Sequence, residues 1–231
     1  MRNRTCWTIL GLLALVAPIG AEPEKGAQSF QGMTVDQQTK TVRVEAKVAV
    51  RKLPHLEQVY PIEVVASWPH ELKAKKAHET VFVTDVQPSD LHRALESLGL
   101  KPGKPAKGEG AKAVGPEINV FIEFKTVDGT VKKMSIHRLI VDPKTKKPLP
   151  KEVKFYFTGS VMTQPDPNKA DTIYGADASG TFIALFPVTD ETVLQSSLTM
   201  KEEKYLKMDT NKDLLPKEGA PIVLILEVAA K

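Results

Sequence analysis

The sequence predicts an α+β fold built on a mainly antiparallel sheet. Three observations lead to this prediction. Two long segments alternate apolar and polar residues with the period of a half-buried strand. One segment, 88–98, carries consistent helix signals. The chain also lacks internal repeats and the alternation of strands with long helices that builds a parallel sheet, so we expect one domain with few helices.

The clearest strand is expected over 42–50, where valine and alanine alternate with arginine, glutamate and lysine. Its hairpin partner is expected at 33–35, across a turn at 36–40. Other apolar or β-branched segments are typical of strands as well. These lie at 60–66, 80–84, 153–157, 181–186 and 222–228. The segment 222–228 is apolar enough to predict a central position in the sheet.

A second alternating run, 118–124, predicts another hairpin. It leads to Asp128–Gly129, a pair favoured in two-residue type I′ turns, and an apolar segment returns at 131–134. We therefore expect a tight turn between these two strands.

The best helix is expected over 88–98. Pro88 suits a first helical position, Asp90 complements the N-terminal end of the helix dipole, and Gly99 supplies the left-handed residue that ends a helix. Its apolar residues recur on one face. A second, short helix is expected over 189–196 with Thr189 as its cap, whereas 101–113 is rich in glycine, proline and lysine and predicts an exposed loop.

The first 21 residues have the features of a secretory signal peptide. Arg2 and Arg4 precede an apolar stretch from Ile9 to Ala17, which is too short to span a bilayer, and the chain turns polar after Ala21. We expect export to the periplasm or the extracellular space, with the segment either cleaved after Ala21 or kept as an anchor. Residues 22–32 are expected to be a flexible leader, and 33–231 a single globular domain without a transmembrane span.

Composition excludes several kinds of site. The only cysteine, Cys6, lies within the expected signal peptide, so a mature chain has no disulfide, thiolate zinc site or iron–sulfur cluster, and we expect no cofactor. Lysines alternate with acidic residues along most of the chain. The exceptions, 73–76 and 101–112, suggest contact with an anionic surface polymer or a lipid headgroup, but without interleaved aromatic residues they do not indicate nucleic acid. The expected partner is an envelope protein or such an anionic surface polymer.

Several short motifs together resemble the YdjY-like domain family of exported bacterial proteins. They cover most of the chain from about residue 33 to 228, and their order and spacing carry the resemblance. The motifs are Ile62–Glu63–Val64, His78–Glu79–Thr80, Asp85, Pro88, Leu91–His92, Ala94–Leu95, Leu98–Gly99, Phe157–Thr158–Gly159–Ser160, Ala176–Asp177, Gly180, Asn211, Leu215–Pro216, Gly219 and Pro221. The resemblance implies a shared single domain and brings no established activity.

The strongest polar candidates for a binding site are Glu63, His78, Glu79 and His92, with Asp177 as a further member. Histidine and carboxylate side chains that converge can bind a divalent metal or perform acid–base chemistry. The alternative is structural: the glutamates pair with lysines, and His92 faces Glu96 one helical turn away. The motif HExxH is absent, and we expect no resident metal.

A second polar motif has the spacing that begins a calcium loop. Asp209, Asn211 and Asp213 follow the pattern D-x-N-x-D, but the sixth position is Leu214 instead of glycine and the twelfth is Ala220 instead of glutamate. An Asx-type turn explains the same residues. No catalytic signature stands out, so the sequence favours a non-catalytic binding or scaffolding module of the bacterial envelope. The alternative is a metal-binding protein or an enzyme that uses the histidine and glutamate site.

Overall fold

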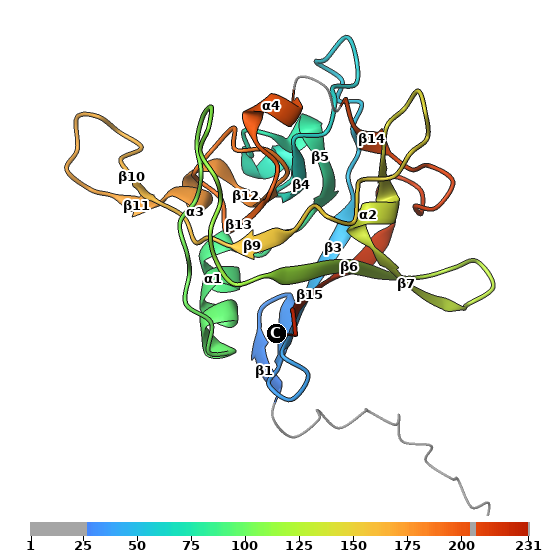
Figure 1. Ribbon diagram of the computed structural model, residues 1–231, viewed down its shortest axis with the longest axis horizontal. Helices are drawn as coiled ribbons and strands as arrows, with labels where there is room; N and C mark the ends of the chain where they lie inside the picture. Colours follow the sequence, from blue (N-terminus) through green and yellow to red (C-terminus); the bar gives the residue numbers. More distant parts are fainter. Residues whose placement is uncertain (1–26, 204–206, 231) are drawn as a thin grey trace, which may run out of the picture.

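The computed structural model describes residues 27–203 and 207–230, and one strongly curved sheet is the main feature of this part of the chain (Figure 1). The expected signal peptide, 1–21, lies outside the described residues. Within them, no helix is long and apolar enough to cross a membrane.

The main sheet has 11 strands, and its central path runs β7-β6-β15-β3-β5-β4-β12-β13-β9. Its strands are β1 (Ala27–Phe30), β2 (Met33–Asp36), β3 (Thr41–Val48), β4 (Val64–Ser67), β5 (Thr80–Val83), β6 (Ile118–Lys125), β7 (Val131–Ser135), β9 (Phe155–Phe157), β12 (Thr181–Ala184), β13 (Leu194–Ser196) and β15 (Pro221–Val228). All pairings are antiparallel except β4 with β5 and β12 with β13. The α+β prediction with a mainly antiparallel sheet is therefore confirmed.

The last strand of the path returns to meet the second. Tyr156 in β9 pairs with Glu117, just before β6, and the Phe157 N–H donates to the Pro116 carbonyl at 2.9 Å. In Figure 1, β9 lies beside β6 accordingly. The sheet thus curls almost into a barrel, which encloses buried apolar side chains such as Phe82, Phe157 and Phe182.

The remaining elements are short. They are η1 (His70–Leu72), η2 (Ala77–Glu79), α1 (Pro88–Ser97), α2 (Ile136–Leu139), β8 (Ile140–Val141), β10 (Met162–Thr163), β11 (Ile173–Tyr174), α3 (Gly175–Ser179), α4 (Met200–Glu203) and β14 (Asp209–Thr210). Strand β8 pairs with β14, and β10 with β11, so two small ladders lie outside the main sheet.

Several sequence predictions are confirmed. The β2–β3 and β6–β7 hairpins form, α1 begins at Pro88, and Gly99 follows it with φ 85°. Strand β15 lies centrally, between β3 and β6, as its apolar sequence predicted. The segment 101–113 contains no helix or strand.

The structure corrects four local predictions. Residues Ala27–Phe30, inside the expected flexible leader, form β1, because their backbone pairs with β2 across Gly32. Strand β4 begins at Val64 and β9 at Phe155, later than expected. The stretch 189–196 is not a helix: its end is β13, where the backbone bonds to both β12 and β9 hold three fully buried residues extended.

The β6–β7 turn also differs from the expected type. Thr126 and Thr130 close a longer loop, since the Thr126 N–H donates to the Thr130 carbonyl at 2.8 Å. The φ angle of Gly129 is positive, at 83°, whereas that of Asp128 is not. A type I′ turn needs positive φ at both central residues, so a single left-handed glycine closes a wider loop here.

Candidate functional site

Three of the five candidate side chains gather around one lysine. Lys76, which precedes η2, places its Nζ atom 2.6 Å from Glu63 Oε2 and 2.7 Å from Glu79 Oε2. Only the contact with Glu63 also has hydrogen-bond geometry. His78 Nε2 lies 3.5 Å from Glu79 Oε1, and its ring packs edge-on against Tyr60. We call Glu63, Lys76, His78 and Glu79 the Lys76 cluster.

Burial determines the charge balance of the Lys76 cluster. Removal from water raises the pKa of Glu79, although Lys76 opposes this effect. Burial alone lowers the pKa of Lys76, but the close contacts and negative charges of Glu63 and Glu79 outweigh it, so the pKa of Lys76 is raised. Lys76 therefore stays cationic at neutral pH and lies between the two carboxylates. The position that a metal ion would need is taken by an ammonium group.

His92 belongs to a different cluster, between α1 and the β10–β11 ladder. Its Nδ1 lies 2.7 Å from the Tyr174 hydroxyl, its Nε2 lies 3.4 Å from Glu96 Oε1, and its ring packs against Phe157. Burial raises the pKa of Tyr174 well above its usual range, so the phenol remains protonated. These contacts attach β11 to α1, and among the residues that the structure describes no hydrogen bond or ion pair joins them to the Lys76 cluster.

Asp177 stabilises the start of a helix. Its Oδ1 accepts a hydrogen bond from the Ser89 N–H at 2.9 Å, in the first turn of α1. The residue before this helix, Gln87, gives no side-chain cap. A carboxylate at this place satisfies a free N–H and complements the helix dipole. Asp177 thus acts as a cap supplied from α3, 88 residues further along the chain.

The predicted histidine and carboxylate site is therefore divided between two places. Glu63, His78 and Glu79 come together, whereas His92 and Asp177 lie elsewhere and have structural partners. In the ranges 27–203 and 207–230, no three histidine or acidic side chains are arranged to hold a metal ion. At the calcium-like motif, Asp209 pairs with Arg51, and Asn211 Oδ1 accepts from the Asp213 N–H at 3.2 Å, which is the alternative Asx turn.

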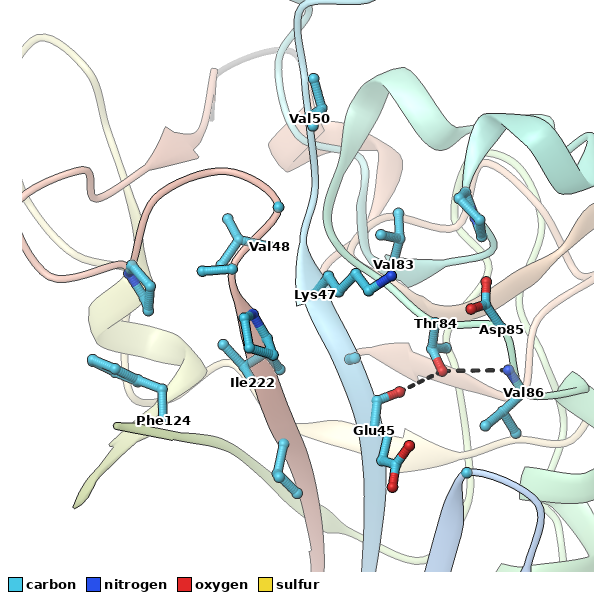
Figure 2. Close-up of a pocket in the computed structure, with 18 of the residues that line it drawn as sticks. Glu45, Lys47, Val48, Val50, Val83, Thr84, Asp85, Val86, Phe124 and Ile222 are labelled. Carbon is cyan, nitrogen blue, oxygen red and sulfur yellow. Dashed lines mark hydrogen bonds between the residues drawn. The ribbon is translucent and has the colours of Figure 1, made fainter. Parts of the chain in front are cut away.

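A large concavity lies elsewhere, beside β3, and no residue motif predicted it. It has a volume of about 1150 Å³. Figure 2 shows Val50, Val48, Lys47 and Glu45 in order along β3 and the residues that follow it, with Val83 to Val86 on one side and Ile222 and Phe124 on the other. Further walls come from Pro69–Leu72 and from the β6–β7 hairpin. We call this concavity the β3 groove.

The β3 groove combines apolar and charged side chains. Val50, Leu72 and Val131 are about half exposed, with 50%, 45% and 54% of their surface open to solvent. The acidic residues Glu45, Glu71 and Asp85 line it without an ion pair to any described residue, as do Lys47 and Lys125. Glu45 and Asp85 flank Thr84, whose hydroxyl donates to the Glu45 carbonyl at 2.7 Å (Figure 2). An open concavity of this composition is suited to binding.

Comparison with known proteins gives one match. Neither the curated proteins nor the solved structures include a significant match to the chain. The family described as YdjY domain matches residues 33–227, from the start of β2 almost to the end of β15. The match covers more than half of the chain and includes the Lys76 cluster, the α1–α3 contact and nearly all of the β3 groove. The chain therefore belongs to the YdjY domain family.

Proposed function

We propose that the protein is an exported, non-catalytic binding module of the bacterial envelope, and that its β3 groove holds a short segment of a partner protein. The observation that carries this proposal is the groove itself. It is a concavity of about 1150 Å³ that exposes several valine and leucine side chains along one surface, and exposed apolar side chains that lie together often mark an interaction site. The charges around it supply specificity.

The unpaired charges of the groove indicate the chemistry of the partner segment. Three carboxylates, Glu45, Glu71 and Asp85, outnumber the unpaired lysines that line the same groove. A lysine or arginine of the partner that lies in the groove gains a charge-assisted contact with one of these carboxylates. The adjoining apolar side chains accept apolar residues on either side of it. We therefore expect a segment with a basic residue between apolar ones.

The enzyme or metal-binding alternative is less well supported. It requires a free group of histidine and carboxylate side chains, but Lys76 forms ion pairs with both Glu63 and Glu79 at distances below 3 Å. Both ring nitrogens of His92 already have partners, the Tyr174 hydroxyl and the Glu96 carboxylate. The arrangement serves to hold β4, η2 and α1 in place.

A peptide array tests the groove. The probes are nonamers with leucine, valine or phenylalanine around a central lysine, glutamine or glutamate. We expect the lysine-centred peptides to bind most tightly. Val50→Asp should weaken their binding by about tenfold, because a carboxylate in an apolar contact must be desolvated. The double variant Glu45→Gln and Asp85→Asn should remove the preference for lysine.

The matched control for the groove is Val114→Asp, which changes a valine that is 60% exposed outside the groove. If Val114→Asp weakens binding as much as Val50→Asp, or if the central residue makes no difference, the groove is not the binding site. Export is tested separately by expressing the full chain in a Gram-negative host. The periplasmic protein should begin at Glu22 by mass spectrometry, and an intact chain free in the cytosol would contradict export.

A further inference from the structure

The small β8–β14 ladder gathers cationic side chains that are far apart in the sequence. Asp209 pairs with Val141 and Thr210 with Ile140, and the Asn211 side chain donates to the Arg138 carbonyl at 3.2 Å. This pairing places the segment 207–213 beside the segment 138–147, and the loops that follow the two strands project from the same side of the view in Figure 1. Six exposed cations lie on these two segments: Arg138, Lys144, Lys146, Lys147, Lys207 and Lys212. We call them the β8–β14 basic patch.

The patch keeps its charge. None of its six side chains forms an ion pair with a described residue, and Asp209 is already paired with Arg51. Asp142 and Asp213 are the other acidic residues of the two segments, so six cations face two carboxylates and four positive charges remain in excess. Other lysines are neutralised: Lys75 by Glu191 and Lys107 by Asp190, at 2.8 and 2.9 Å.

The turn in the patch has a defined shape. Asp142 Oδ1 accepts hydrogen bonds from the Lys144 and Thr145 N–H groups, both at 2.8 Å, and the Lys146 N–H donates to the Asp142 carbonyl at 2.9 Å. Lys146 has a left-handed backbone with φ 58°. Because the turn is held by these bonds, its lysines project from a fixed backbone, which reduces the entropy that binding has to remove.

We propose that the β8–β14 basic patch binds a linear polyanion, a polymer that carries phosphate or other acidic groups along its chain. This surface is separate from the β3 groove, so the inference goes beyond the proposed function. A polyanion that contacts several cations at once releases its counterions and binds multivalently. A bilayer surface fits less well: none of the large exposed apolar side chains lies in 138–151 or 207–217, so nothing there inserts into lipid.

The test uses inorganic polyphosphate as the probe and measures its affinity at several salt concentrations. The patch variant carries Lys144→Glu, Lys147→Glu and Lys212→Glu. We expect it to bind about tenfold or more weakly than the unchanged protein, with a smaller dependence of affinity on salt, because fewer phosphate contacts remain. The control variant carries Lys101→Glu, Lys104→Glu and Lys112→Glu, three exposed lysines in the 101–113 loop.

Both variants carry the same change in net charge. A difference between them therefore shows that polyphosphate binds at the basic patch, and not through the net charge of the whole protein. The proposal is supported if the control loses less than about threefold. It is overturned if both variants weaken equally, or if the unchanged protein does not bind polyphosphate. It is also overturned if phosphatidylglycerol vesicles bind the unchanged protein, lose affinity in the patch variant, and are not displaced by polyphosphate. Thermal unfolding of both variants checks that the fold is kept.

Discussion

Two lysine-rich regions of this molecule have opposite roles. The run 73–76 has three lysines in four residues, as does 144–147 in the patch, yet Lys75 and Lys76 are paired with Glu191, Glu63 and Glu79 in the fold. The β8–β14 basic patch is assembled from two segments about 60 residues apart in the sequence, 138–147 and 207–213, and its cations form no ion pair with a described residue. A run of lysines in the sequence therefore does not by itself identify an anion-binding surface. What matters is which carboxylates the fold brings near them.

The largest expected effect separates the two regions by stability. Lys76→Met removes the cation between Glu63 and Glu79, whose side chains are only 20% and 11% exposed. Two unneutralised and partly buried carboxylates remain, so we expect the free energy of unfolding to fall by about 2–3 kcal/mol. Urea denaturation measures this change.

The matched control is Lys147→Met, because this lysine is exposed and has no ion pair with a described residue. It should change the free energy of unfolding by less than about 0.5 kcal/mol. If both variants lose the same free energy of unfolding, the ion pairs of Lys76 do not stabilise the fold more than an exposed lysine does.

A second prediction concerns how pH acts on the Lys76 cluster. The pKa of Glu79 is raised in the folded protein, mainly by burial, so the folded state holds this proton more tightly than the unfolded chain. This contribution to stability is complete below the unfolded value of 4.5 and is lost as pH rises through the folded pKa. Glu79→Gln should abolish that loss.

Urea denaturation from about pH 4.5 to about pH 7.5 tests this prediction, because the folded and unfolded states then differ in proton uptake. The control is Glu218→Gln, which removes a carboxylate from an exposed position and should leave the pH dependence as it is in the unchanged protein. If Glu79→Gln also leaves it unchanged, Glu79 does not carry the proton that links folding to pH.

The smallest expected effect lies in the basic patch. Asp142 accepts two backbone hydrogen bonds, which lower its pKa and keep it ionised at neutral pH. Asp142→Asn retains an oxygen that can accept the same bonds but removes a negative charge among the lysines. Polyphosphate should therefore bind about two- to threefold more tightly, as one fewer like charge opposes it. Asp171→Asn, at an exposed position outside the patch, should have no effect, and weaker binding by Asp142→Asn would contradict the proposed role of the patch.

The parts of the fold that the sequence predicted are those with local signals. Alternation in 42–50 and 118–124 predicted β3 and β6, and Pro88, Asp90 and Gly99 predicted α1. The failures occurred where backbone pairing with distant strands decides the conformation. Residues 194–196 carry no strong period, but β9 and β12 hold them extended as β13.

The candidate site was predicted only in part. Glu63 and Glu79 meet because β4 and β5 are neighbours, but the partner that decides their role, Lys76, carried no signal beyond belonging to a lysine run. Asp177 was identified as a polar candidate, yet its contact with Ser89 depends on how α3 packs near α1. The β3 groove had no motif at all, because its residues come from segments spread from Gln31 to Val223.

The sequence by itself determined the elements whose signals lie within about ten residues, namely the alternating strands and the capped helix. It also determined membership of the YdjY domain family, through the order of motifs along the whole chain. Tertiary structure alone decided which charges are neutralised, which concavity stays open, and which cations gather on one surface. The physical reason is that Coulomb interactions and burial depend on distance in space, and the crossing of strands in this curved sheet sets those distances.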